Sequence, residues 1–242
     1  MTWLTVTACT VAFGGLKAIN DLSLNIPSGS ITALIGPNGS GKSTFCNMAS
    51  GQIPPNSGQI LLGDQPVTRL RSDQIVAAGL ARTYQVPRVP RELTIGEVIG
   101  VPLRYVRSDR ALPCQARNVA DIARFCGLTA PLDTTCAELS ISDLRRLEIA
   151  RALACRPRLL LLDEAMAGLS LEDTAQVIDL VRKVHAGGIT VVVIEHVMRI
   201  IATLCGHAIV LNNGKLLAEA APAEVLRNPA VREAYLGKGF TL

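Results

Sequence analysis

At 242 residues the chain can bury a sizeable core, and its length suits one large domain better than two independent ones. Its formal net charge of +4 is small and evenly spread, and aromatic residues make up only 3% of it, so nucleic acid is disfavoured as a partner. The apolar runs fall far short of the roughly 20 residues that span a membrane, and no basic segment precedes an apolar stretch near the start, so we expect a cytoplasmic chain that does not cross a membrane by itself.

The beginning of the chain predicts strands around a glycine-rich loop. The segment WLTVTACTVAF alternates like a half-buried strand, and LSLNIPSGSITALIG predicts two strands around the turn at residues 27–29. After Gly41 the pattern becomes helical and closes at Gly51. The segment GQILLGDQPV that follows predicts a hairpin.

The middle of the chain predicts a helical insert. From about Pro90 to Cys136 the strand signal fades, and EVIGVPLRYV and QARNVADIARFCGL carry apolar residues at helical spacing. We expect loops at Pro102, Pro113 and Pro131. Helices and strands alternate again in DLRRLEIARALA, RLLLLDE, LEDTAQVIDLVRKVHAGG and ITVVVIEH, which predicts a parallel sheet covered on both faces.

The segment GPNGSGKST matches G-x-x-x-x-G-K-[ST], with a strand before it and a helix after it, as the phosphate-binding loop requires. Its glycines let successive backbone N–H groups point at phosphate oxygens, and the helix start adds a partial positive charge. Lys42 would reach the terminal phosphates, and Ser43 would supply an oxygen to Mg²⁺. The candidate binding residues are Gly36, Pro37, Asn38, Gly39, Ser40, Gly41, Lys42, Ser43 and Thr44.

Two carboxylates follow the apolar strand in LLLLDEA, where they are costly unless a cation faces them. We expect Asp163 to hold Mg²⁺ and Glu164, which the strand pleat directs elsewhere, to polarise the attacking water. A placed base of this kind contributes about 10²–10⁴-fold in rate. The alternative is a structural Asp-Glu pair, and the phosphate-binding loop upstream favours the catalytic interpretation.

His196 follows VVVIE, so it is expected at the carboxyl edge of the sheet, where ligands bind in open α/β folds. The alternative is a hydrogen-bonded structural histidine, and only the neighbouring motifs favour the ligand-binding interpretation over it. In LSISDLRRLEIARALA, Ser140 and Asp143 form the pattern of a capping box that begins a helix. This helix start is a second candidate anion site in the same chain.

The order of these motifs resembles the ATP-binding subunit of an ABC transporter over nearly the whole chain. The motifs are the phosphate-binding loop, ARTYQV with Gln85, LSISDL, LLLLDEA, AGLSLED and VIEHVM. The resemblance implies an α/β fold with a P-loop NTPase (RecA-like) core and a parallel sheet, an antiparallel β subdomain at the N-terminal side and a helical subdomain insert. It implies one domain over residues 1–242, with the catalytic core at 1–89 and 146–242 and the helical subdomain at 90–145.

The same resemblance implies roles for individual residues. Phe13 would stack on adenine, and Gln85 would join the metal site of Ser43 and Asp163 to the helical insert. His196 would lie near the γ-phosphate and act with Glu164 and Lys42 in catalysis. Residues 168–170 would meet the opposite subunit. In this family two subunits pack head to tail, so that ATP lies between the phosphate-binding loop of one and the signature helix, here Ser140 and Ser142, of the other. Binding that favours ATP over ADP then controls whether the dimer is closed.

This chain departs from the usual signature L-S-x-G-[QD]-Q, because Ser142 takes the fourth place and Leu144 the sixth. At position 142 we expect a Cβ and a hydroxyl where glycine permits close approach to a phosphate. Losing one aimed donor costs on the order of 3 kcal/mol, or about a hundredfold in rate. We therefore expect an impaired site at this signature and a heterodimer with a partner whose signature is intact, with a homodimer as the alternative.

The segments FGGLKAINDLSL, ARTYQVPRV and GHAIVLNNGKLLAEAAPAEVLRNPAVREAYLG are similar to the ATPases of branched-chain amino-acid importers, which pair unlike subunits. The resemblance implies an ATPase with ATP and Mg²⁺ as cofactors, peripheral on the cytoplasmic face of the inner membrane. Its partners would be transmembrane permease subunits, a second ABC ATPase and, indirectly, a periplasmic solute-binding protein. The alternatives are uptake of a related small solute, a degenerate ATP-binding half with weak hydrolysis, and a soluble ABC-type ATPase switch.

Overall fold

The computed structural model describes residues 2–106, 110, 116 and 118–236. Within them the strands form a six-stranded sheet of order β10-β9-β3-β8-β7-β6 and a four-stranded antiparallel sheet of order β2-β1-β4-β5. The strands of the larger sheet are β3 (Ile31–Ile35), β6 (Leu80–Arg82), β7 (Leu159–Asp163), β8 (Thr190–Ile194), β9 (His207–Asn212) and β10 (Lys215–Ala220). Those of the smaller sheet are β1 (Thr2–Phe13), β2 (Leu16–Pro27), β4 (Ser57–Leu62) and β5 (Gln65–Pro66).

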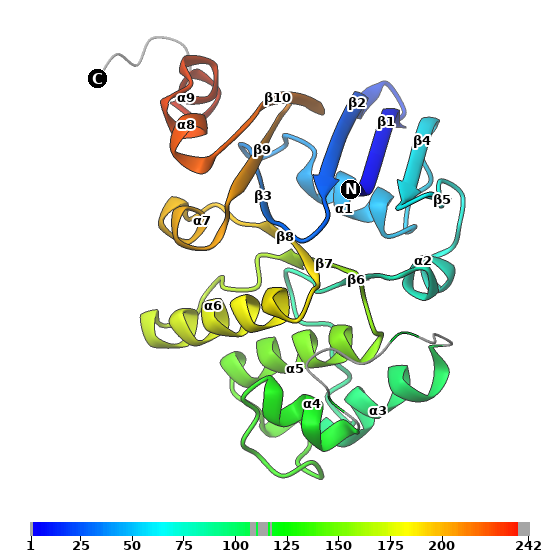
Figure 1. The fold of residues 1–242 in the computed structure, drawn as a ribbon, viewed down its shortest axis with the longest axis vertical. Helices are drawn as coiled ribbons and strands as arrows, with labels where there is room; N and C mark the ends of the chain where they lie inside the picture. Colours follow the sequence, from blue (N-terminus) through cyan, green and yellow to red (C-terminus); the bar gives the residue numbers. More distant parts are fainter. Residues whose placement is uncertain (1, 107–109, 111–115, 117, 237–242) are drawn as a thin grey trace.

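The helices lie around these sheets and in a separate cluster below them (Figure 1). In the described residues they are α1 (Lys42–Ala49), α2 (Ser72–Ala78), α3 (Ile95–Tyr105), α4 (Val119–Phe125), α5 (Ile141–Ala154), α6 (Leu171–Ala186), α7 (Met198–Leu204), α8 (Pro222–Arg227) and α9 (Pro229–Leu236), with a 3₁₀ turn at Cys136–Glu138. None of these helices is long and apolar enough to cross a membrane.

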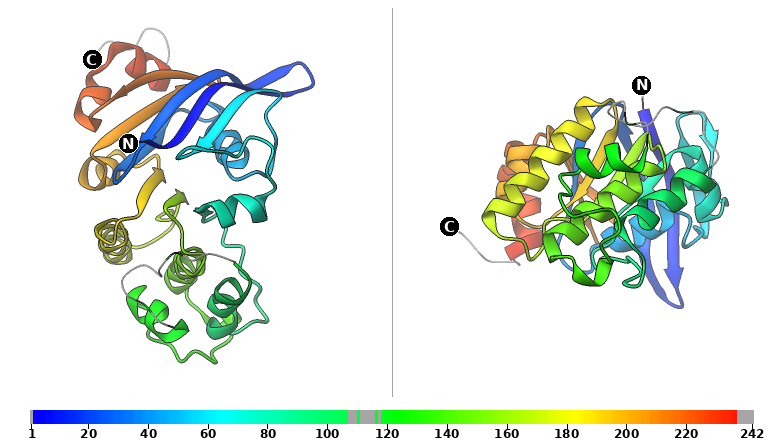
Figure 2. Two further views of the ribbon diagram at one scale, coloured as in Figure 1. Left: turned by 45° about the vertical axis from the view of Figure 1, so that its right-hand side comes forward. Right: turned by 90° about the horizontal axis from the view of Figure 1, so that it is seen from below.

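The central strands bury both faces, as their continuous apolar runs predict. Along β7, Leu160 and Leu162 pack into one core and Leu159 and Leu161 into another, because successive side chains of a strand point to opposite faces. The first core contains residues of α5 and α6, and the second contains residues of α1 and the antiparallel sheet. Figure 2 shows these layers on either side of the larger sheet. The predicted α/β fold with an antiparallel subdomain is confirmed.

Two features of the larger sheet differ from the expectation. Its edge strand β10 pairs antiparallel with β9, whereas β9-β3-β8-β7-β6 are all parallel. Neither the short strand β6 nor the β9–β10 hairpin was predicted from the sequence. The strands β6 and β10 lie at the two edges of the sheet, where pairing partners rather than a long apolar run determine that the segment becomes a strand.

The helical insert forms where it was expected, with α3, α4 and α5 packed together. The expectation of a loop at Pro102 was wrong, because Pro102 lies inside α3. A proline in a helix removes one N–H donor but keeps its carbonyl, and the Pro102 carbonyl oxygen accepts from the Val106 N–H at 2.9 Å. Pro131 lies in a loop, and Pro113 falls outside the described residues. The border expected after residue 145 falls within α5, which is a single helix.

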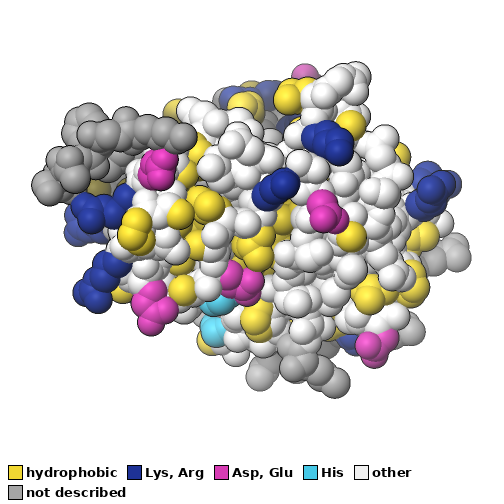
Figure 3. Space-filling view, turned by 90° about the horizontal axis from the view of Figure 1, so that it is seen from above, with side chains coloured by type: hydrophobic (Ala, Val, Ile, Leu, Met, Phe, Trp, Pro, Cys, Tyr) yellow, Lys and Arg dark blue, Asp and Glu magenta, His cyan; other side chains and the backbone are white. Residues whose placement is uncertain are grey.

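Charged side chains of both signs are interspersed on the face seen from above, with hydrophobic side chains between them (Figure 3). This pattern fits the small, evenly spread net charge.

Candidate active site

The phosphate-binding loop connects β3 to α1 and depends on glycine at defined points. Gly36, Gly39 and Gly41 have φ values of +152°, +77° and +106°, which side chains rarely adopt. A Cβ on Gly36 would lie 2.2 Å from the Leu211 carbonyl oxygen, so the loop could not close on β9 with any other residue there. No described side chain caps α1, and its first N–H groups therefore remain available to an anion.

The Lys42 ammonium lies across the loop. Its Nζ donates to the Gly36 and Pro37 carbonyl oxygens at 2.6 and 3.0 Å and to the Ser40 hydroxyl at 3.4 Å. Desolvation lowers the pKa of Lys42, and the negative charge of Glu164 opposes that shift. The loop therefore holds a cation that has lost part of its hydration, and an arriving phosphate can compensate for the lost hydration.

A cavity of about 550 Å³ lies over the loop and has the size of a small-molecule site. It gathers Phe13, residues 38–44 of the loop, Gln85 and Glu164 from distant parts of the sequence. The Phe13 side chain, at the end of β1, is 51% exposed and is available for stacking. Gly36 and Pro37 do not line the cavity, and they form the base of the loop through their bonds to Lys42.

Asp163 ends β7, does not line this cavity, and has a protein cation as its partner. Its Oδ2 accepts from Arg82 Nη2 at 2.6 Å, with the two side chains 8% and 7% exposed. Arg82 also donates to Asn47 Oδ1 at 2.7 Å. We expected a cation to face Asp163 and named Mg²⁺ for that role, and the structure shows that Arg82 is also a cationic partner of this carboxylate. Arg82, on the edge strand β6, supplies the charge that a buried carboxylate requires.

Glu164 directly follows β7 and lines the cavity. Its φ is +47°, a conformation that costs on the order of 1–3 kcal/mol for a residue other than glycine. Its N–H donates to the Ile194 carbonyl oxygen at 3.0 Å, and its Oε2 accepts from Gln85 Nε2 at 2.8 Å. The bent backbone therefore directs a carboxylate toward the phosphate-binding loop and holds it there.

The residues expected at the metal site offer oxygen donors of the kind that Mg²⁺ takes. Ser43 and Gln85 line the cavity together with Glu164, whereas Asp163 does not line it and is paired with Arg82. In the part of the chain that the structure describes, no group of three or more His, Cys, Asp or Glu side chains lies close enough together to hold a metal ion. The mixed set of hydroxyl, amide and carboxylate oxygens fits magnesium.

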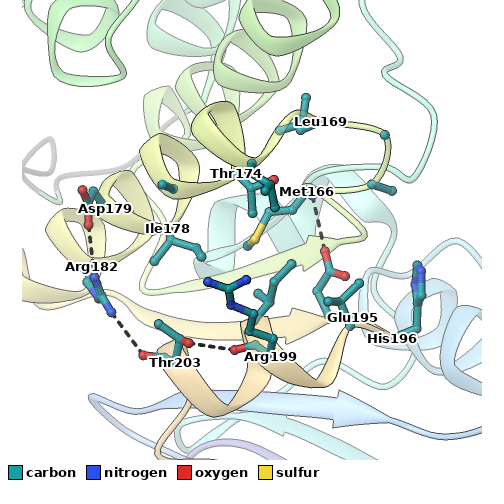
Figure 4. Close-up of a pocket in the computed structure, with 16 residues that line it drawn as sticks. Met166, Leu169, Thr174, Ile178, Asp179, Arg182, Glu195, His196, Arg199 and Thr203 are labelled. Atoms are coloured by element: carbon teal, nitrogen blue, oxygen red, sulfur yellow. Dashed lines mark hydrogen bonds and ion pairs between the residues drawn. The ribbon is translucent and has the colours of Figure 1, made fainter.

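His196 lies in a second cavity, of about 510 Å³, between α6 and α7 (Figure 4). The structure does not place it on the wall of the cavity that contains Lys42 and Glu164. Its neighbour Glu195 is 2% exposed, and Glu195 Oε1 accepts from the Met166 N–H at 3.3 Å. Glu195 thus ties the end of β8 to the turn that follows Glu164.

Ser140 and Ser142 begin α5 but point to different partners. The Ser140 hydroxyl accepts from the Asp143 N–H at 3.1 Å and donates to Asp143 Oδ2 at 2.7 Å, so Ser140 caps the helix as expected. The Ser142 hydroxyl is buried and donates to Asp173 Oδ1 on α6 at 2.7 Å. The expectation that this hydroxyl stands at the anion-facing surface was wrong, because Asp173 draws it inward. Leu144, at the sixth signature position, is also buried, in the core beneath α5.

The sequence profile of a family described as "ABC transporter" matches residues 19–167, more than half of the chain. The chain belongs to this family. A second profile, described as "Branched-chain amino acid ATP-binding cassette transporter", matches residues 215–241 of this ABC protein.

Curated relatives match this ABC protein along nearly its whole length. It is 34% identical to the high-affinity branched-chain amino acid transport ATP-binding protein LivG of Escherichia coli, over 97% of this chain and 98% of LivG. It is 32% identical to BraF of Pseudomonas aeruginosa, which has the same description, with the same coverage. The solved structure of the ADP conformation of MJ1267, an ATP-binding cassette of an ABC transporter, matches with a TM-score of 0.85 and 30% identity, over 98% of this chain and 100% of that one.

Three parts of the site in this ABC protein were missed by the sequence analysis. Arg82 and Glu195 were not singled out, because only the folded sheet shows which carboxylate or amide each residue meets. The β9–β10 turn was also missed, although its Asn-Gly pair is a hairpin signal. In that turn the Gly214 N–H donates to the Ser40 carbonyl oxygen at 3.0 Å, and Asn213 lines the cavity.

The burial of Glu195 leads us to expect that the stability of the fold depends on pH. Burial raises its pKa above the ordinary value of 4.5, opposed by the Met166 N–H and by His196, while Glu164 adds to the rise. A raised carboxyl pKa gives stability that is complete below the unfolded pKa and is lost as pH rises through the folded pKa. Glu195→Gln is therefore expected to flatten the fall in the free energy of unfolding as the pH rises above about 4.5, by about 1.4 kcal/mol per unit of pKa shift.

The measurement is urea unfolding of the chain at a series of pH values. Glu148, whose pKa is also raised by burial, remains in both proteins. The free energy of unfolding of the variant is therefore still expected to fall with pH, but with a smaller slope than that of the native protein. Equal slopes for the two proteins would show that Glu195 titrates normally.

Proposed function

We propose that this chain binds and hydrolyses ATP with Mg²⁺ to drive uptake of branched-chain amino acids, or of a closely related small solute, through membrane permease subunits. The observation that carries the proposal is the cavity that brings Phe13, the phosphate-binding loop, Gln85 and Glu164 together. The likeness to LivG and BraF, and the match of residues 215–241 to the branched-chain family, support this class of solute.

The residues around the cavity have separate roles in ATP binding and hydrolysis. Phe13 stacks on the base, and the free N–H groups at the start of α1, together with Lys42, bind the phosphates. Ser43, Gln85 and Asp163 would hold Mg²⁺, which would supply charge neutralisation for the phosphate oxygens. Glu164 accepts the proton of the attacking water, and Gln85 keeps its carboxylate oriented.

We further propose that the chain works in a pair with a second, unlike ABC ATPase, with His196, Ser140 and residues 168–170 at the shared face. Ser140 is exposed at the start of α5, and Leu171, directly after that loop, is 83% exposed. Exposed groups at these positions are available to a partner. The departures from the signature at Ser142 and Leu144 favour an unlike partner over a second copy.

An apolar groove supports a permease as the other partner. It is a cavity of about 370 Å³ between α2, β6, α3 and α5. On its wall, Val101 and Tyr105 of α3 are 51% and 73% exposed, which is costly for side chains of this size unless a partner covers them. Gln85 lies two residues after Thr83, which continues β6, so a partner in this groove is linked through a short segment to the carboxylate of Glu164. A contact of this kind with a permease would hold the chain at the cytoplasmic face of the inner membrane, with a periplasmic solute-binding protein acting from the opposite side.

The test is reconstitution with the permeases and the companion ATPase. We expect the full assembly in vesicles to couple ATP hydrolysis to leucine uptake. We expect the isolated chain to hydrolyse ATP at least about tenfold more slowly, because it lacks the signature helix of the unlike partner that completes its site. An isolated chain that is as fast as the assembly would contradict the unlike pair, and hydrolysis without uptake of any aliphatic amino acid would contradict the solute.

A further inference from the structure

The N-terminal ends of α5 and α6 are joined by one carboxylate. Asp173, in the first turn of α6, accepts from the Ser142 hydroxyl at 2.7 Å through Oδ1 and from the Ser170 hydroxyl at 2.7 Å through Oδ2. The Asp173 N–H donates back to the Ser170 hydroxyl at 3.0 Å. The same carboxylate therefore caps its own helix and holds a residue of the neighbouring one.

Arg146 adds a second connection between the two helices. Its guanidinium lies 3.5 Å from Asp173 Oδ1 and 3.3 Å from Asp143 Oδ1, and it also bonds to Gln176. The Arg146 side chain is 13% exposed and that of Asp173 is 33% exposed. The link is therefore partly shielded from water, which strengthens its charged bonds.

The bond from Ser142 is a hydrogen bond to an ionised group. The Ser142 hydroxyl, followed by the Ser170 hydroxyl and the Arg146 charge, lowers the pKa of Asp173. Hydrogen bonds to charged acceptors are shorter and about twice as strong as neutral ones. A glycine at position 142 has no donor with which to replace this bond.

We propose that Ser142 is a positioning residue, which fixes the start of α5 against the segment of residues 168–170 that leads into α6. The proposal rests on the proposed pairing with a second ATPase, because these are the two surfaces that this chain offers to it. Through Asp173 they move as one unit. Ser142 then supports hydrolysis in the paired assembly instead of obstructing it.

The link joins the two helices but is not required to build either of them. Ser140 caps α5 and Ser170 caps α6, so each helix start is stabilised by its own residue. The inner faces of both helices are buried in the core that also contains Leu144 and Val177. Removing the Ser142 hydroxyl is therefore expected to weaken the contact between the N-terminal ends of α5 and α6 and to leave the fold intact.

The experiment compares Ser142→Ala, Ser142→Gly and Ser142→Thr in the complete assembly of permeases and both ATPases. We expect the alanine and glycine variants to lower kcat by about tenfold, the effect of one hydrogen bond to a charged group, with little change in KM. The threonine variant keeps the hydroxyl and is expected to recover most of the rate. ATP affinity of the isolated chain is expected to stay the same in all three.

Hydrogen exchange of the Asp173 amide in the isolated chain tests the link between Ser142 and Asp173 independently of ATP hydrolysis. We expect exchange to quicken in the alanine and glycine variants and to be restored by threonine. A glycine variant with a higher kcat would overturn the proposal and show that the Ser142 side chain obstructs the phosphate. Rates or amide exchange unchanged in the alanine and glycine variants would also overturn it. A wild-type assembly that hydrolyses no ATP would instead refute the proposed function, and the exchange result would still decide the link.

Discussion

Replacing Glu164 by glutamine is expected to lower ATP hydrolysis by about 10²–10⁴-fold while leaving ATP binding intact. The reason is that the amide removes the base but keeps an oxygen that can accept from Gln85 Nε2, which lies 2.8 Å from the carboxylate in the native chain. The bent backbone at this position, with φ of +47°, does not depend on the side-chain charge. A chain that binds ATP and cannot hydrolyse it is expected to accumulate as the closed pair.

The measurement has two parts, steady-state hydrolysis by the reconstituted assembly and size-exclusion of the two ATPases with ATP. Glu233→Gln, on the exposed surface of α9, is the matched control and is expected to behave as the native protein. If Glu164→Gln bound no nucleotide, Glu164 would be needed for the site itself and its role as a base would be wrong.

Replacing Lys42 by alanine is expected to weaken ATP binding by about 10–100-fold, because charge-assisted hydrogen bonds contribute about 1.5–3 kcal/mol. In the native chain the Lys42 ammonium is held at the loop by two backbone carbonyl oxygens and one hydroxyl, with part of its hydration lost. The ammonium is therefore already partly desolvated and in position when a phosphate arrives. The expected change is in affinity, which distinguishes Lys42 from Glu164.

Isothermal titration of the isolated chain with ATP measures this effect. Lys183→Ala, at an exposed position of α6, removes the same charge away from the cavity and is expected to leave the affinity unchanged. Equal losses in the two variants would show that net charge, and not the position of Lys42, attracts the nucleotide.

The phosphate-binding loop was predictable because its determinants are local. The positive φ values at Gly36, Gly39 and Gly41 are requirements of the loop itself, and the strand and helix on either side follow from neighbouring residues. The same holds for the Ser140 cap, which joins residues three apart. The direction of the Glu164 side chain does not follow from such a rule, because Glu164 comes after β7 and its φ of +47°, not the alternation of a strand, turns its carboxylate toward the cavity.

The partners of the buried charges were not predictable from such rules. Arg82 and Asp163 are separated by 81 positions, and the parallel pairing of β6 with β7 brings them together. Ser142 and Asp173 are separated by 31 positions and meet because α5 and α6 begin side by side. In each case a buried charge or hydroxyl needs a hydrogen-bond partner, because leaving it without one is costly. Many residues of the chain could be that partner, so the sequence does not identify it.

The sequence alone therefore determined the fold class, the phosphate-binding loop and the candidate catalytic carboxylate, since each depends on residues close together in the chain. Only the tertiary structure decided that Arg82 faces Asp163, that His196 lies in a separate cavity and that the Ser142 hydroxyl turns toward α6. The physical reason is that a short pattern fixes backbone conformation, whereas the partner of a polar side chain depends on which distant elements pack against it.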